Sequence, residues 1–212
     1  MIPKETKVLF LLASALCFAL TLIPAPQREQ RSLLEPFGAF AATIQWARAD
    51  AAFDAGRIDV GLARAESALE LNPKAAAGWS WLASVLVHRF GAPEFEATAT
   101  ARRAWVVAGV DLLKRGEGIS REPARLAFHA GLIMAYVSSI PDGVLEWPGG
   151  SGATWRASAL HFERAKDFGH PRAEEAAQAA WLEVYSPHKH DELEFDRVNT
   201  STSSTEETSD KN

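Results

Sequence analysis

The sequence predicts an all-α protein in which antiparallel helix hairpins stack side by side, preceded by one transmembrane helix. Three observations support this fold class. Alanine, the strongest helix former, occurs 38 times in 212 residues. Apolar residues recur at three- and four-residue spacing rather than in alternation. Glycine and proline fall between these amphipathic stretches, where turns are needed.

The N-terminal segment is predicted to be a membrane anchor. An uncharged apolar run from Val8 to Ile23 follows Lys4 and Lys7. With the next three residues it would form a helix of about 28 Å, against a hydrocarbon core of about 30 Å. We therefore expect residues 1–26 to be a transmembrane anchor that meets the membrane through residues 8–26. A cleaved signal segment and a buried helix of the domain are the alternatives.

Two further features bear on processing and orientation. Signal cleavage after Ala25 is disfavoured because Ile23 is not small and Pro26 would follow the cut. Basic residues lie on both sides of the apolar run, so the positive-inside rule does not decide the orientation. The usual behaviour of N-terminal anchors favours a single-pass protein of a bacterial inner membrane with the body exported. A secreted or periplasmic protein is the alternative after cleavage.

The remainder divides by composition into a linker at residues 27–34, a helical domain at residues 35–185 and a disordered acidic tail at residues 186–212. Turn residues divide the domain into seven expected helices. They span about 35–54, 59–71, from just after Pro73 to 90, 94–114, 122–138, 153–168, and from just after Pro171 to 185. Hairpins of this length cannot bury both faces alone, so they must stack.

Apolar side chains on each expected helix are predicted to face the core. The first helix contributes Phe37, Phe40, Ile44, Trp46, Ala49 and Phe53. The fifth helix contributes Leu126, Ala130, Leu132, Ile133 and Tyr136. Both sets recur at helical spacing, which predicts one buried stripe on each helix.

The third expected helix carries a recognisable spacing. Trp79, Leu82, Ala83 and Leu86 are separated as in the first helix of a tetratricopeptide repeat, and Trp46, Ala49, Asp50 and Phe53 have the same spacing 33 residues earlier. The stretch from Ala65 to Pro73 resembles the second helix of that repeat and its exit, and the stretch from Ala159 to Ala173 is similar to the junction of Sel-like repeats. The resemblance implies a right-handed α-solenoid whose concave face holds a peptide or a protein.

This resemblance implies an adaptor that binds another protein in its groove. The expected groove walls are exposed polar positions on the first helices of the hairpins: Gln45, Arg48, Ser80, Ser84 and His88. Trp81 is a further candidate because it points to a different side of its helix from Trp79. A structural subunit of a membrane-associated complex is the alternative function.

The long connection from Pro141 to Gly152 is a second candidate binding element, because loops of this length within a compact domain are often functional. Val144, Leu145 and Trp147 in this loop either contact a partner or cover the neighbouring groove. Both interpretations stay open at the level of the sequence.

The sequence gives little support for catalysis. It has no HExxH pair, phosphate loop, dinucleotide-binding glycine pattern or nucleophile elbow. His188, His190, Asp191 and Glu192 fit a solvated cluster better than a metal site. Of the net charge of −5, the tail carries −4, which leaves no positive field for nucleic acid. We therefore expect no enzyme activity, cofactor, metal ion, small-molecule substrate or nucleic-acid partner.

Overall fold

The computed structural model describes residues 27–141 and 144–185, with side chains described from residue 37 onward. All regular elements within these ranges are helical, which confirms the all-α class. In order they are α2 (Gln27–Asp54), α3 (Ile58–Leu71), α4 (Ala76–Ser84), η1 (Val85–Phe90), α5 (Ala99–Glu117), α6 (Pro123–Ser138), α7 (Gly150–Asp167) and α8 (Ala173–Tyr185). The expected anchor and tail lie outside the described residues. No helix within the described ranges is long and apolar enough to cross a membrane.

The contacts divide the chain into two units, Met1–Ser67 and Ala68–Asn212. In the first unit, α2 and α3 form a hairpin whose turn includes Gly56 at φ 71°. Gly61 lies against the ring of Phe53, where a Cβ would come within 2.2 Å of Cε1. Glycine at this position therefore allows α3 to approach α2 closely.

Helix α2 is longer than expected. It begins at Gln27 rather than near Glu35, so residues 27–34, predicted as a linker, continue the helix. No glycine or proline stands between Gln27 and Glu35 to interrupt it. The prediction that the apolar residues of α2 are buried is wrong for three of them, because Phe37, Phe40 and Ile44 are 72%, 69% and 39% exposed.

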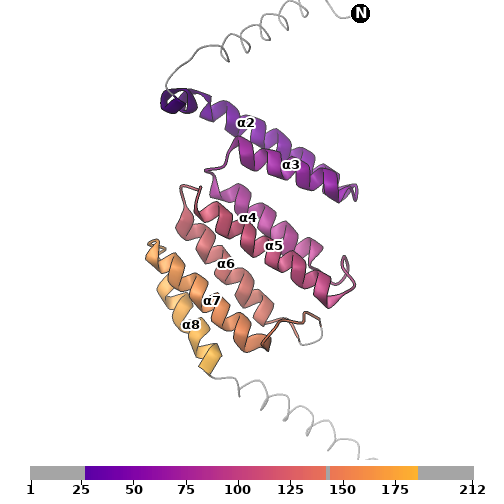
Figure 1. Cartoon of the computed structure of the whole chain (residues 1–212), viewed down its shortest axis with the longest axis vertical. Coiled ribbons are helices and arrows are strands. Elements are labelled where there is room, and N and C mark those ends of the chain that lie inside the picture. The colour runs from indigo at the N-terminus through magenta and orange to yellow at the C-terminus, as the bar shows by residue number, and fades with distance from the viewer. Residues whose placement is uncertain (1–26, 142–143, 186–212) are drawn as a thin grey trace, which may run out of the picture. The chain divides into compact units, whose positions relative to one another are not determined.

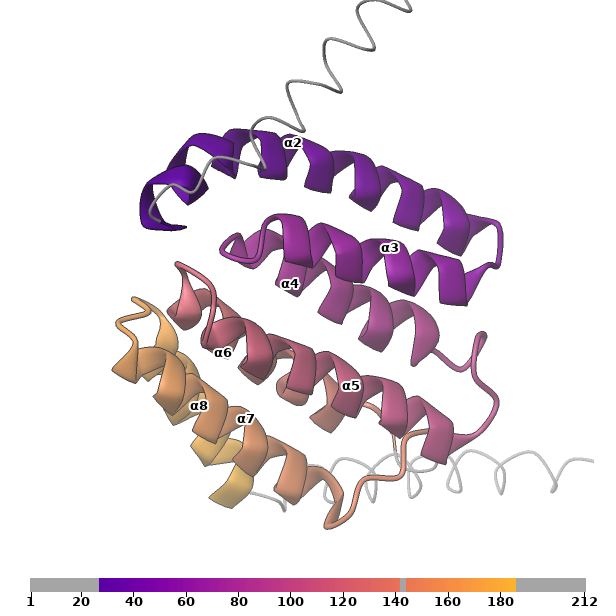
Figure 2. The same cartoon turned by 45° about the horizontal axis from the view of Figure 1, so that its top comes forward.

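In the second unit, consecutive helices lie side by side and alternate in direction (Figure 1, Figure 2). Each of the helices from α4 to α8 packs against the next one, and α4 also packs against α6. The core includes Trp79, Leu113, Leu126, Ile133 and Phe162, all nearly inaccessible to solvent. The indole Nε1 of Trp79 donates a hydrogen bond to the Pro73 carbonyl at 2.8 Å.

Helix α5 begins five residues later than expected and ends three residues later. Thr98 caps its start by accepting a hydrogen bond from the Ala101 amide at 3.2 Å. The helix ends at Glu117 with Gly118 as its C-cap, so Gly116 lies within the last turn. A Cβ there would lie 2.8 Å from ring atoms of Trp79 and from Leu126, so this glycine makes room for core packing.

Helix α4 continues directly into the π-helical segment η1. The Gly91 amide donates to the Leu86 carbonyl at 2.9 Å, five residues earlier, as a π turn requires. Leu86, Val87 and Phe90 are buried along this segment. The expected helix therefore reaches Phe90, but its last part is wider than an α-helix.

Candidate protein-binding face

Helix α4, the η1 segment that continues it and helix α6 bring a set of polar and aromatic side chains together. The Ser84 hydroxyl oxygen lies 3.4 Å from Nε2 of His129. The His88 ring meets the edge of the Tyr136 ring at a centroid distance of 4.7 Å. Leu132 lies between His129 and Tyr136 in helical order and shares their side of α6. We refer to Ser84, His88, His129, Leu132 and Tyr136 as the α4–α6 face.

The spacing of these residues explains how the two helices position them. His129, Leu132 and Tyr136 follow one another at three and four residues and so form one stripe on α6. Ser84 ends α4 and His88 lies in η1, and the two contact His129 and Tyr136. The buried stripe of α6 includes Leu126, Ala130 and Ile133. Leu132 and Tyr136, predicted to be core, are instead 48% and 45% exposed, because they lie one position away from that stripe.

The two histidines of this face favour the neutral form. Burial lowers the pKa of His88. Burial also lowers the pKa of His129, and the positive charges of His88 and Arg125 lower it further. At neutral pH the face thus offers uncharged imidazoles, hydroxyl groups and apolar area. These groups suit hydrogen bonding and packing to a polypeptide.

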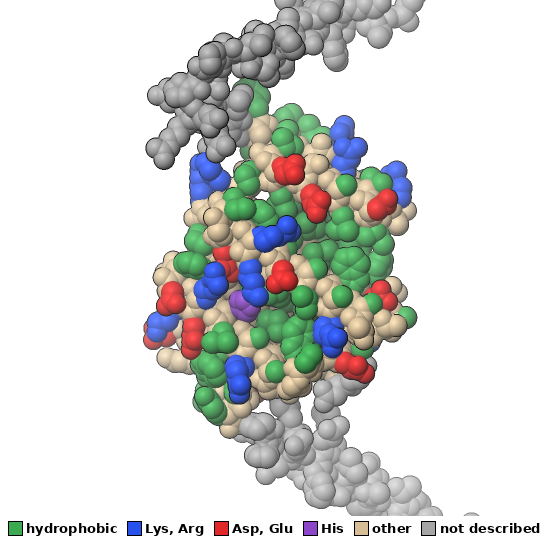
Figure 3. Space-filling view, viewed as in Figure 1, with side chains coloured by type: hydrophobic (Ala, Val, Ile, Leu, Met, Phe, Trp, Pro, Cys, Tyr) green, Lys and Arg blue, Asp and Glu red, His purple; other side chains and the backbone are tan. Residues whose placement is uncertain are grey.

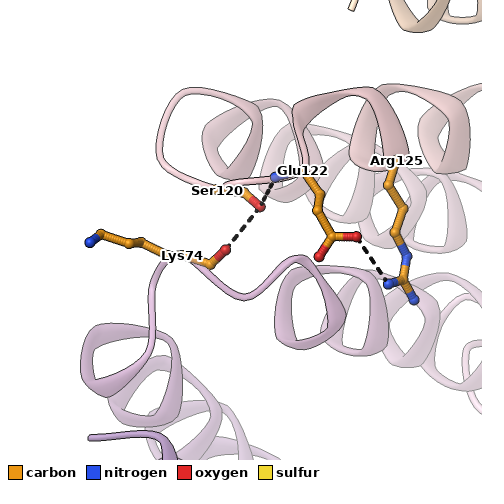
Figure 4. Close-up of polar contacts among 4 residues, drawn as sticks. All are labelled: Lys74, Ser120, Glu122 and Arg125. Carbon is orange, nitrogen blue, oxygen red and sulfur yellow. Dashed lines mark hydrogen bonds and ion pairs between the residues drawn. The ribbon is translucent and has the colours of Figure 1, made fainter. Parts of the chain in front are cut away.

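A set of polar contacts joins the chain just before α4 to the start of α6 (Figure 4). The Ser120 hydroxyl donates to the Lys74 carbonyl at 3.2 Å and accepts from the Glu122 amide at 3.0 Å. Arg125 Nη1 pairs with Glu122 Oε2 at 3.5 Å. These contacts hold the starts of α4 and α6 together and place the Arg125 guanidinium beside the Glu122 carboxylate, while the Lys74 side chain points away from it.

The structure places the sequence-predicted groove residues in two groups. Gln45 and Arg48 lie in the first unit, where Gln45 Oε1 accepts from Arg64 at 3.3 Å and Arg48 is exposed. Ser84 and His88 belong to the α4–α6 face. Ser80 and Trp81 on α4 are half-buried, and the Ser80 hydroxyl has no hydrogen-bond partner within the part of the chain that the structure describes.

Sequence reasoning missed His129 as part of this face and Arg125 one turn before it on α6. A signal was present, because Arg125, His129, Leu132 and Tyr136 recur at four- and three-residue steps on the expected fifth helix. Assigning Leu132 and Tyr136 to the core concealed this second stripe.

The predicted loop residues lie beside a buried arginine. Arg102, which is 7% exposed, donates from Nε to the Val144 carbonyl at 2.7 Å and also from Nη2 to the same oxygen. Its Nη1 donates to the carbonyls of Glu96 and Ala97, both at 2.8 Å. Arg102 thus connects the loop after α6 to the loop before α5.

Within this connection Leu145 is 7% exposed and Trp147 is half-buried. Both line a hollow of about 230 Å³ together with Val137 and Thr154. The burial of Leu145 favours the interpretation in which this loop covers the neighbouring groove. The Trp147 side chain stays partly accessible to solvent.

A separate ionisable cluster joins α5 to α7. Arg164 Nε lies 2.6 Å from Oε2 of the buried Glu117. Burial raises the pKa of Glu117, whereas Arg164 and Lys114 oppose that rise. Burial, helped by the same two cations, lowers the pKa of His161 to about 4.

The described residues contain no group of three or more His, Cys, Asp or Glu side chains placed to hold a metal ion.

On the surface seen in Figure 3, acidic and basic side chains are both present and are interspersed with hydrophobic ones. Comparison with family models, with curated proteins and with solved structures finds no match for the chain.

Proposed function

We propose that this chain is a membrane-held adaptor that binds another protein or a peptide on the α4–α6 face. The observation that carries the proposal is the combination, on one surface, of the exposed Leu132 and Tyr136 with the imidazoles of His88 and His129. Aromatic and aliphatic anchors beside hydrogen-bonding groups are common at the centres of protein interfaces.

A right-handed solenoid of the tetratricopeptide type is the proposed frame for this face. The packing of α4 against both α5 and α6 supports it, since first helices of successive hairpins adjoin in such stacks. Trp79, Leu82, Ala83 and Leu86, which carry the resemblance, are 6%, 2%, 0% and 6% exposed. Their burial supports the packing role that the resemblance implies.

Residues 8–26 are the proposed membrane anchor, in a single-pass arrangement with the body exported from a bacterial inner membrane. A secreted or periplasmic form is the alternative if the segment is cleaved. Alkali washing of membranes from cells that carry a C-terminal tag tests the anchor, because an integral protein stays in the pellet. Protease added outside then digests the tag if the body is exported.

Photo-crosslinking in cells tests the binding face directly. A photoreactive amino acid replaces Tyr136 or His88, and matched controls replace Val107 and Leu160, which are 41% and 53% exposed on α5 and α7. We expect one discrete protein adduct from the two α4–α6 positions and none from the controls. Equal labelling at all four positions would overturn the proposed face.

A structural subunit of a membrane complex remains the second proposal. Removing residues 1–26 separates the two functions. An adaptor lacking the anchor should remain folded and monomeric in size-exclusion chromatography, whereas an obligate subunit should aggregate once its partner helices are lost.

A further inference from the structure

One stripe of helix α2 is apolar and exposed. Phe37, Phe40 and Ile44 are 72%, 69% and 39% exposed, and Ala47 is exposed as well. Their spacing of three, four and three residues places them on one side of the helix. We refer to these four residues as the α2 stripe. Exposed phenylalanines grouped in this way mark a surface that meets an apolar environment.

The surroundings of the α2 stripe are also uncharged. Residues 37–47 contain no Asp, Glu, Lys or Arg. The Thr43 hydroxyl donates to the Ala39 carbonyl at 3.0 Å, so the helix itself satisfies this exposed donor. Gln45 accepts its hydrogen bond from Arg64 of α3. The first charged side chain after the stripe is the exposed Arg48, one turn beyond Ile44.

The position of the α2 stripe along the chain indicates what covers it. Helix α2 begins at Gln27, directly after the proline-containing end of the apolar run at residues 8–23. Ten residues of helix, about 15 Å, separate Gln27 from Phe37. A helix that starts where an anchor leaves the bilayer keeps its first turns within reach of the lipid surface.

We propose that α2 lies along the membrane surface with the α2 stripe inserted among the lipid acyl chains near the headgroups. This inference rests on the anchor in the proposed function. An interfacial helix buries aromatic and aliphatic side chains on one side and keeps its other side for protein or water. In α2 that other side includes Phe53, which packs against Gly61 of α3. Arg48, at the end of the stripe, is suited to a lipid phosphate.

Fluorescence quenching in vesicles tests the inference on the full chain. The single cysteine is removed by Cys17→Ser, and Phe40→Cys or Ile44→Cys introduces an attachment point for an environment-sensitive dye. The matched control is Ala63→Cys, an exposed position on α3. Vesicles contain phosphatidylcholine and phosphatidylglycerol at about three to one, with or without brominated phosphatidylcholine. We expect a blue shift and bromine quenching at positions 40 and 44 and neither effect at position 63.

Flotation of the same vesicles separates this inference from the anchor. If the chain floats but the dyes at positions 40 and 44 resemble the control, the inference fails and the anchor stands. Disulfide-linked dimers of the unlabelled Phe40→Cys variant, without quenching in the dye-labelled protein, would identify a second copy as the occupant and also overturn it. A chain that does not float overturns the anchor and the inference together. Circular dichroism of each variant checks that α2 remains folded.

Discussion

The guanidinium group of Arg102 and the backbone carbonyl of Val144 are joined by a 2.7 Å hydrogen bond from Nε. The two residues are 42 positions apart in the sequence. Because Arg102 also donates to Glu96 and Ala97, one buried side chain fixes two loops at the same end of the second unit. Its buried charge is stabilised by carbonyl dipoles, which the loops present in the required geometry.

Replacing Arg102 by methionine should destabilise the second unit by about 3 kcal/mol, because three carbonyl groups lose a charged donor. Urea denaturation followed by circular dichroism measures this loss. The matched control is Arg103→Met, which removes a more accessible hydrogen bond to the Glu146 carbonyl. We expect the control to cost less than about 1 kcal/mol. Similar losses for both variants would contradict the role of Arg102 as the connection between the loops.

Alanine at Gly131 should destabilise the contact between α6 and α7. The added Cβ would lie 2.5 Å from Cδ1 and Cε1 of Phe162, so the ring or the helix must move, at a cost of about 1–3 kcal/mol. Gly152→Ala, in the first turn of α7, has no atom within 4 Å and should be neutral or slightly stabilising. Thermal unfolding compares the two variants. A stable Gly131→Ala protein would show that α6 and α7 pack less closely than described.

Removing Arg164 should destabilise the protein, because the buried Glu117 carboxylate then loses the cation that pairs with it. We expect Arg164→Gln to destabilise the protein by about 1–3 kcal/mol at pH 8, a value reduced because Arg164 is partly exposed. Without this cation the pKa of Glu117 rises further, so the loss should be smaller at pH 5 than at pH 8, because lower pH favours the uncharged carboxyl group. Lys166→Gln, which breaks the exposed pair with Glu174, is the control and should have little effect. Urea midpoints at both pH values decide the outcome.

His161 should make the folded state sensitive to acid. Its pKa is about 4 when folded and about 6.5 when unfolded, so below pH 6.5 the unfolded chain binds a proton that the folded chain does not. Stability should therefore fall as the pH decreases from about 6.5 to about 4. His161→Gln should show a shallower decline over this range in urea titrations, since carboxylates contribute equally to both proteins. Parallel curves would show that His161 titrates normally.

The helical class and most turns could be predicted because they depend on local chemistry. Alanine-rich amphipathic stretches predicted the helices, and Pro73 and Pro171 marked turns that the structure contains. The start of α5 was harder to locate because Glu94 and Glu96 suit a helix, while the cap at Thr98 becomes apparent only from its hydrogen bond. The packing role of Gly116 is likewise invisible in the sequence, because it depends on the Trp79 ring that lies against it in the fold.

Only part of the candidate site could be predicted from the sequence. Ser84 and His88 followed from the resemblance, but their neighbours on α6 depend on which helices lie side by side, which periodicity does not specify. The contacts of Arg102 could not be predicted from the sequence, because its hydrogen-bond acceptors are backbone oxygens in two loops. Any residue could supply such oxygens, so the loops carry no sequence signal for the pairing.

The π-helical segment at Val85–Phe90 has a consequence for inferring sides of this helix from spacing. A π turn holds more residues than an α turn, so the three- and four-residue steps that define one side of an α-helix do not define one side across η1. Leu86, Val87 and Phe90 are all buried there, although Leu86 and Val87 are neighbours in the sequence. Positions for substitution in this segment should therefore be chosen by their exposure, as for the exposed His88, rather than by helical spacing.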